Sequence, residues 1–271
     1  RTYQKQQEVT QVIIMVKELR MKMPRLGTRK LYYLLHDQLK ELGIGRDRLF
    51  AIMKANNMQI IPKRQYHITT DSHHRFRKHK NLIEFMPINR PEQVWVSDIT
   101  YIGTRSNPMY LSLVTDAYSK YIMGFNVSRT LDASGAVAAM KQAIKHRKYP
   151  TEFLIHHSDR GLQYCGHAYQ KLLKDENITC SMTESYDPYQ NAVAERINGI
   201  LKQEFIRGIK TSDIELMHKL IEQSIHIYNN LRPHWSGYMN TPKEMHQQRK
   251  IKIRTYKTKI QTKVNLSLDH I

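Results

Sequence analysis

Residues 94–102 read Val-Trp-Val-Ser-Asp-Ile-Thr-Tyr-Ile, a run of β-branched and aromatic residues with a carboxylate near its centre. This composition is typical of a buried β-strand. Asp98 is the exception, because an unpaired charge inside a sheet is costly and therefore needs a partner. A metal ion is one such partner. The stretch therefore predicts a strand that carries a candidate metal ligand.

The sequence that follows predicts an α/β core with a mixed sheet. Asn107-Pro108 is a turn signal, after which further strands are expected at 109–115, 121–128, 153–155 and 178–182. Helices are expected at 132–147, 163–175, 191–208 and 212–230. This order of strands and helices predicts a sheet that contains both antiparallel and parallel pairs.

The first 58 residues predict a small all-α domain. Apolar residues recur at helical spacing over 4–21, 28–42 and 47–57, with proline and glycine between these segments. Three short helices rich in Lys and Arg favour a helix-turn-helix-like DNA-binding module, although any small helical bundle gives the same pattern. The expected DNA contacts are Arg29, Lys30, Arg46 and Arg48.

Positive charge is concentrated on either side of the predicted core. The chain of 271 residues carries a net charge of +19, of which +11 lies in 1–92, +1 in 93–198 and +7 in 199–271. This excess predicts a polyanionic partner, with nucleic acid expected first and an anionic membrane surface second. The domains expected are a helical domain at 1–58, a basic linker at 59–92, an α/β core at 93–210, and a C-terminal helix with a basic tail at 211–271.

Several classes of protein are excluded. Cys165 and Cys180 are too few for a disulfide scaffold or a four-cysteine zinc site, and a reducing cytoplasm fits them best. No apolar run approaches the ~18 residues of a membrane span, and no signal-peptide pattern is present. The histidines of the basic linker fit no zinc-site spacing. We therefore expect a cytoplasmic protein without a membrane partner.

Two further carboxylates are placed where they could join Asp98. Asp159 follows an apolar strand, and sites in open α/β sheets commonly lie beyond the carboxyl ends of strands. Glu195 belongs to a helical stripe that also contains Asn191, Asn198 and Lys202. Each carboxylate alone could be structural. Asp98 could cap a turn, and Glu195 could pair with a neighbouring cation.

Three carboxylates on one α/β core suit Mg²⁺ or Mn²⁺. Two such ions, about 4 Å apart, can activate an attacking oxygen and stabilise the leaving oxygen of a phosphodiester. The residues therefore indicate phosphoryl-transfer chemistry as the main alternative to three separate structural roles. Asp116, a fourth carboxylate near the sheet edge, is expected to be structural, and Trp95 and both cysteines are expected in the core.

The order Asp98, Asp159, Glu195, with 35 residues between the last two, resembles that of the Asp-Asp-Glu recombinases, which include retroviral integrases and many bacterial transposases. The local sequences carry the resemblance: Trp-Val-Ser-Asp-Ile-Thr-Tyr at 95–101, His-Ser-Asp-Arg-Gly at 157–161, Asn-Ala-Val-Ala-Glu-Arg at 191–196, and Asn-Asn-Leu-Arg-Pro-His at 229–234. From about residue 5 to 250, the chain most resembles the second-frame product of the insertion-sequence-three family of transposases.

This resemblance implies an RNase-H-like integrase core with a mixed five-stranded sheet. It implies that Asp98, Asp159 and Glu195 hold two Mg²⁺ ions per active site, and that the chain cleaves and joins DNA at the ends of an insertion sequence. The implied partners are the terminal inverted repeats, the target DNA, at least one more copy of the chain, and an upstream-frame segment that relatives acquire by frameshifting. Bacterial nucleoid DNA is the implied location of the bound protein.

The resemblance also implies further DNA contacts. Lys202 is expected near the reacting end. From the residues themselves, Arg160 and Arg196 either contact phosphates or neutralise the acidic cluster, and Asn191 is expected to contact DNA. Tyr186 and Tyr189, in the loop before Glu195, could stack on unpaired bases. Relatives often have glycine where Tyr186 stands, and the zinc module of retroviral integrases is absent from this sequence.

Two other functions remain open. A catalytically inactive DNA-binding regulator could keep the same fold, although the complete set of three carboxylates argues against it. An RNase-H-type nuclease would share the core. The basic flanking regions and the position of Lys202 favour an enzyme that joins DNA.

Overall fold

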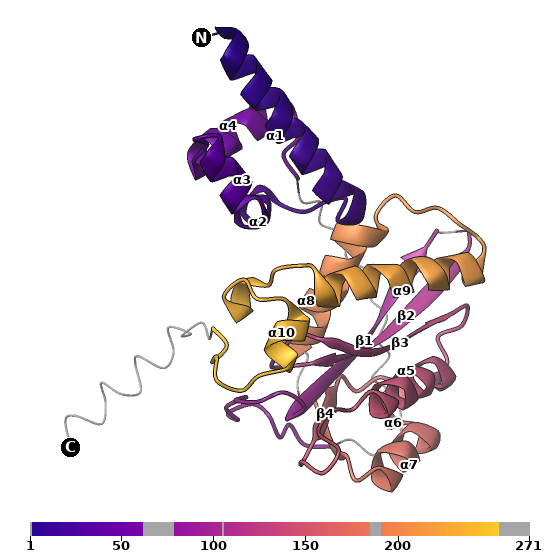
Figure 1. Cartoon of the computed structure of the whole chain (residues 1–271). Coiled ribbons are helices and arrows are strands. Elements are labelled where there is room, and N and C mark those ends of the chain that lie inside the picture. The colour runs from indigo at the N-terminus through magenta and orange to yellow at the C-terminus, as the bar shows by residue number, and fades with distance from the viewer. Residues whose placement is uncertain (1, 62–78, 105, 185–190, 255–271) are drawn as a thin grey trace, which may run out of the picture.

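The computed structural model describes residues 2–61, 79–104, 106–184 and 191–254 (Figure 1). A five-stranded sheet with the order β3-β2-β1-β4-β5 lies at the centre of the α/β part. Its strands are β1 (Val94–Gly103), β2 (Pro108–Asp116), β3 (Ile122–Ser128), β4 (Ile155–Ser158) and β5 (Thr179–Met182). β1, β2 and β3 pair antiparallel, whereas β4 and β5 run parallel to β1. The mixed five-stranded sheet predicted from the sequence is confirmed.

Helices cover both faces of the sheet. One face packs against α5 (Ala133–Lys145), α6 (Leu162–Cys165) and α7 (His167–Asp175), in a core that includes Trp95 and Cys165. The other face packs against α8 (Ala192–Ile200), η2 (Leu201–Ile206) and α9 (Ile214–Asn230). The sheet is therefore the middle of three layers (Figure 1), and its buried strands expose few side chains to water.

Four helices precede the core: α1 (Thr2–Lys22), α2 (Thr28–Leu34), α3 (His36–Glu41) and α4 (Arg46–Ala55). The single helix expected over 28–42 is thus two helices. The interruption at Leu35 is local, because its N–H still bonds the Leu31 carbonyl and its carbonyl still accepts from the Leu39 N–H. Buried apolar side chains of these helices and of the α8–α9 face form one continuous cluster. A DNA-reading role for these helices stays a prediction.

Residues 79–92, assigned from the sequence to a basic linker, pack on the core. The Leu82 N–H donates to Ser181 Oγ at 2.9 Å. Ile83, Met86 and Ile88 lie against a buried cluster of β1 and β4 side chains. The segment ends at the fully buried Glu92. Its prolines and charges suggested a solvated linker, but its apolar residues pack against inner strands of the sheet.

Two other helices differ from their predicted extent. The helix expected over 163–175 is divided into α6 and α7 at Gly166, whose backbone is extended (φ −62°, ψ 146°). The helix expected over 191–208 continues past Ile200 as the π-helix η2. η3 (Trp235–Gly237) and α10 (Pro242–His246) follow α9, and the basic tail after 254 lies outside the described residues. No helix in the described part is both long and apolar enough to span a bilayer.

Candidate active site

The register between β1 and β4 brings two of the predicted ligands together. The last pair of these parallel strands is Val96 with His157. Asp98 and Asp159 each lie two residues beyond that pair, on neighbouring strands that run in the same direction. Because equal steps along parallel strands cover equal distances, both carboxylates reach the same edge of the paired region.

The turn after β4 holds Asp159. The Gly161 N–H donates to Asp159 Oδ1 at 3.0 Å. A Cβ atom at Gly161 would lie 3.1 Å from the same oxygen. Glycine at this position therefore leaves room for the carboxylate to turn back towards its own backbone.

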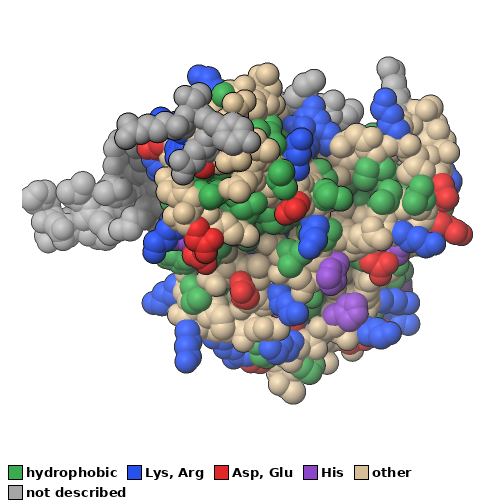
Figure 2. Space-filling view, turned by 45° about the horizontal axis from the view of Figure 1, so that its top comes forward, with side chains coloured by type: hydrophobic (Ala, Val, Ile, Leu, Met, Phe, Trp, Pro, Cys, Tyr) green, Lys and Arg blue, Asp and Glu red, His purple; other side chains and the backbone are tan. Residues whose placement is uncertain are grey.

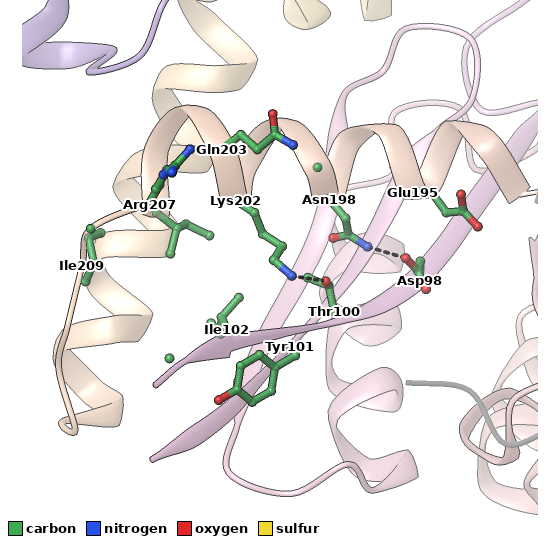
Figure 3. A pocket seen from close by; sticks show the side chains of 14 residues that line it. Asp98, Thr100, Tyr101, Ile102, Glu195, Asn198, Lys202, Gln203, Arg207 and Ile209 are labelled. Atoms are coloured by element: carbon green, nitrogen blue, oxygen red, sulfur yellow. Dashed lines mark hydrogen bonds between the residues drawn. The ribbon is translucent and has the colours of Figure 1, made fainter. Parts of the chain in front are cut away.

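Helix α8 presents its polar stripe to β1 through a series of hydrogen bonds. Asn191 Nδ2 donates to the Ser97 carbonyl at 3.0 Å, and Asn198 Nδ2 donates to Asp98 Oδ2 at 2.7 Å. Lys202 Nζ donates to Thr100 Oγ1 at 3.3 Å (Figure 3). The predicted stripe thus faces the strand that carries Asp98, and Glu195 lies on the same helix beside it.

Burial and the nearby negative charges both raise the pKa values of Asp98 and Glu195. Burial and, after it, the charges of Asp159 and Glu195 raise the pKa of Asp98 to about 7, against the hydrogen bonds from Asn198 and the Ile99 backbone, which lower it. Burial also raises the pKa of Glu195, and Asp159 adds to it. Such shifts arise where negative charges meet without enough compensation. The structure therefore brings the three predicted carboxylates within electrostatic range of one another.

The donor chemistry of this group fits a divalent cation, because hard carboxylate oxygens are what Mg²⁺ and Mn²⁺ prefer. A cation would also offset the repulsion that raises the pKa of Asp98. In the described part of the chain, no three His, Cys, Asp or Glu side chains lie close enough to form a finished ligand set. A bound ion would therefore require the carboxylates to turn towards each other.

A pocket of about 400 Å³ extends from these carboxylates along η2. Asp98 and Glu195 lie at one end and Arg207 at the other, with Lys202 between them (Figure 3). Sequence reasoning missed Gln203 and Arg207, because a period of 3.6 residues does not continue through a π-helix. The pocket combines an acidic end with a basic end, as a site for a phosphodiester requires.

Four N-terminal residues predicted to contact DNA have partners within the chain. Arg46 pairs with Asp47 at 2.9 Å, and Arg48 pairs with Glu8 at 2.5 Å; Arg46, Asp47 and Arg48 are exposed, and Glu8 is half-buried. The guanidinium of Arg29 lies 5.2 Å from the centre of the Trp235 ring, and Lys30 Nζ lies 3.7 Å from a Glu204 oxygen. Arg29 and Lys30 thus join the N-terminal helices to the rest of the molecule in this state.

The remaining predicted contacts differ in exposure. Arg196 is exposed on α8, Arg160 is half-buried beside Asp159, and Asn191 is buried by its bond to β1. Tyr186 and Tyr189 lie outside the described residues. Buried Asn191 is better placed to fix the start of α8 than to touch DNA.

Asp116 is structural, as predicted. It is fully buried and accepts hydrogen bonds from the Glu92 N–H and from Ser119. His246, which the sequence did not single out, lies between it and Glu92, with contacts of 3.8 and 3.2 Å. Burial alone would lower the pKa of His246, but the hydrogen bonds and charges of both carboxylates raise it to about 9. This network fixes α10 to the sheet.

Comparison with known proteins agrees with the geometry. Two family models, each described as an integrase core domain, match residues 88–188 and 176–242. The uncharacterized 31 kDa protein of insertion element IS600 from Shigella sonnei is 32% identical over 228 residues, which cover 80% of this chain and 82% of that protein. The transposase InsF for insertion sequence IS3A from Escherichia coli is 36% identical over 149 residues, 54% of this chain and about half (51%) of that protein.

Among solved structures, the chain is similar to one in the simian T-cell lymphotropic virus intasome in complex with the PP2A regulatory subunit B56 gamma. The TM-score is 0.52 at 17% identity, with 85% of this chain and 78% of that chain covered. At this identity the likeness concerns the fold. It agrees with the arrangement of sheet and helices described above.

Proposed function

The chain belongs to the IS3 family of insertion-sequence transposases, and we propose that Asp98, Asp159 and Glu195 are the catalytic carboxylates with which it cleaves and joins DNA ends. The observation that carries the assignment is the convergence of these three side chains near the end of the β1–β4 pairing, where Asp159 and Glu195 raise the pKa of Asp98, and Asp159 raises that of Glu195. A purely structural carboxylate in this chain, Asp116, is instead surrounded by donors.

Each step of the reaction forms one phosphorus–oxygen bond and breaks another. In cleavage, a water oxygen attacks the phosphorus, and the bond to the 3′ oxygen breaks to leave a 3′-hydroxyl. In joining, that hydroxyl attacks a second phosphodiester and releases its 3′ oxygen. Proteins with the integrase fold generally use divalent metal ions, which, when bound, activate the attacking oxygen and stabilise the leaving oxygen.

The protein's own residues would position the reactants. Asp98, Asp159 and Glu195 would hold the ions, two per active site, as Mg²⁺ or Mn²⁺. Asn198 would hold the carboxylate of Asp98 in place through its 2.7 Å hydrogen bond to Oδ2. Lys202 lies beside Thr100 at the centre of the pocket, where its ammonium would bind a phosphate oxygen.

Basic side chains away from the pocket would hold the DNA backbone. Figure 2 shows Lys and Arg side chains spread over one face of the molecule rather than gathered in one strip. Contacts with separated phosphates suit DNA that crosses several elements. The expected ligands are the terminal inverted repeats and a target DNA. Two ends must meet, so at least two copies of the chain are expected on DNA at the bacterial nucleoid.

The test uses the full chain and a duplex that carries one terminal repeat of its element. Asp98→Asn, Asp159→Asn and Glu195→Gln should abolish Mg²⁺-dependent nicking and end joining while the duplex is still bound. Glu222→Gln is the matched control, because Glu222 is an exposed residue of α9 away from the pocket. Normal joining by any one of the three variants would remove that residue from the site.

The same assay separates the competing functions. A wild-type chain that binds its ends but never nicks them would be a DNA-binding regulator on this fold. Cleavage of an RNA–DNA hybrid without strand joining would indicate an RNase-H-type nuclease. Mg²⁺-dependent joining of two DNA ends is the result expected here.

A further inference from the structure

Glu204 lies within η2, two residues after Lys202, on the side of the helix that does not face the pocket. Lys202, Gln203, Ile206 and Arg207 all line the pocket, whereas Glu204 does not. Phe205, its neighbour, is buried in the apolar core. The back of η2 is therefore anchored while its front carries the basic residues of the site.

Arg232 binds both oxygens of Glu204. Its Nη2 donates to Oε1 at 2.6 Å and its Nε donates to Oε2 at 2.7 Å. Arg232 is only 1% exposed, and its guanidinium lies 5.6 Å from the centre of the Tyr228 ring. Two parallel hydrogen bonds fix the orientation of a carboxylate as well as its distance.

The ionised form of Glu204 is favoured in this position. Burial alone would raise its pKa, but the hydrogen bonds and charge of Arg232, with Lys30 and Arg196, bring it below the usual value. Lys30 Nζ, 3.7 Å from Oε1, comes from α2. One carboxylate thus ties η2 both to the segment after α9 and to the N-terminal helices.

The clamped segment η2 is a π-helix. Runs of this geometry are rare and mostly appear as single turns at functional sites. Six consecutive residues adopt it here, immediately after the helix that carries Glu195. The rotation of η2 decides which way Lys202 points, and in the structure its Nζ reaches Thr100 on β1.

We propose that Glu204 is a positioning residue for the DNA-joining reaction: clamped by Arg232, it fixes the rotation of η2 and thereby keeps Lys202 directed at the carboxylate end of the pocket. The proposal rests on the function proposed above. Glu204 itself touches no reacting group. Its effect is expected to pass through Lys202.

The first measurement needs no DNA. Amide hydrogen exchange of the full chain should become faster in residues 201–207 in Glu204→Gln, by roughly tenfold or more, because local opening of η2 becomes easier. Arg232→Lys, which keeps the charge but loses the planar fork, should show the same change. Glu222→Gln should exchange like the wild type. Unchanged exchange at 201–207 in a folded Glu204→Gln protein would overturn the proposal.

The second measurement asks whether Glu204 acts through Lys202. Lys202→Ala should reduce the salt slope of DNA binding by about 1, as expected for one lost phosphate contact. Glu204→Gln should reduce it similarly and should slow end joining on the order of 100-fold, since a small misplacement can cost that much. The double variant should bind DNA and join ends no less well than Lys202→Ala, because the effects of two changes that act on one contact are not additive.

The outcomes are distinguishable. Glu204 would be merely structural if the losses of joining rate in Glu204→Gln and Lys202→Ala added up in the double variant. The same conclusion would follow if Glu204→Gln lowered the melting temperature but left the salt slope of DNA binding unchanged. The wild type could fail to join DNA ends while Glu204→Gln still speeds amide exchange in residues 201–207. In that case the proposed function would be wrong, but the role of Glu204 in fixing η2 would be supported. If Glu204→Gln does not fold, Arg232→Lys serves as the variant in both measurements.

Discussion

Asn198 of α8 donates its side-chain amide to Asp98 of β1 at 2.7 Å, so a helix residue orients the carboxylate of a strand 100 positions earlier in the chain. This hydrogen bond favours the charged form of Asp98, whereas burial and the neighbouring carboxylates oppose it. The balance leaves the pKa of Asp98 at about 7. Deprotonation of this side chain therefore falls within the range in which bacterial enzymes work.

Metal affinity should consequently depend on pH. Because a carboxylate must be ionised to bind a divalent cation, Mn²⁺ affinity is expected to increase as the pH rises through the Asp98 pKa of about 7. Calorimetric titration of the full chain with Mn²⁺ on either side of that pH measures the effect. In Asn198→Leu the rise should move to higher pH. An affinity independent of pH would show that the protonation of Asp98 does not control binding.

The buried His246 should make stability depend on pH in the opposite direction. Its folded pKa of about 9 lies above the ordinary histidine value of 6.5, so its contribution to stability is fully present below pH 6.5 and is lost as the pH rises to 9. At about 1.4 kcal/mol per unit, this is on the order of 3 kcal/mol. Denaturant unfolding of the wild type and of His246→Gln at several pH values gives the difference between their free energies of unfolding.

The pH effect must be taken as the difference in unfolding free energy between the wild type and His246→Gln, because other buried groups titrate over the same pH range. Burial lowers the pKa values of Lys120 and Lys30 to about 8, which adds stability as the pH rises. Both lysines are present in the variant, so their contribution cancels in the difference. A difference that stayed constant from pH 6.5 to 9 would contradict the ion-pair role of His246.

Gly161→Ala should impair catalysis more than folding. Gly161 has φ −63°, which alanine adopts freely, so backbone strain is absent. The added Cβ would lie 3.1 Å from Asp159 Oδ1 and 3.0 Å from Gln163 Oε1, and one of these side chains must move. We expect joining to fall roughly tenfold or more from the displaced carboxylate, with a loss of about 1 kcal/mol or less in stability. Equal joining rates in the wild type and Gly161→Ala would mean that the side chain of Gln163 moves instead of Asp159.

Gly199→Ala should stabilise the protein. Gly199 lies within α8, and nothing is within 4 Å of the position that its Cβ would take. Replacing an unstrained helical glycine with alanine adds about 0.5–1 kcal/mol, largely by restricting the unfolded chain. The midpoint of urea unfolding should rise with an unchanged slope. A lower midpoint would contradict this prediction, because it would show that the added methyl group destabilises the native state.

The sequence predicted the elements whose signals are local. The strand expected at 94–102 is β1, and the helix expected at 212–230 is α9, because alternation and amphipathic spacing are read from neighbouring residues. The three carboxylates could be identified from their order along the chain. Their convergence required the parallel register of β1 and β4, which no local pattern specifies.

What the sequence missed depends on contacts between distant segments. Lys30 reads as an exposed helical cation, yet Glu204, 174 positions later, gives it a partner. The π-helical geometry of η2 cannot be read from a 3.6-residue period. The pairing of His246 with Glu92 and Asp116 joins three segments that carry no common motif.

The pairing of β1 with β4 also limits how the chain can change in length. A residue inserted into either strand before its aspartate would shift one carboxylate by a full step and turn it to the opposite face of the sheet. The connection between β1 and β2, in contrast, lies at the far end of β1 from this pairing and can absorb such a change. Deletions and insertions in inactive copies of such elements should therefore be most damaging within the few residues that separate each strand's start from its aspartate.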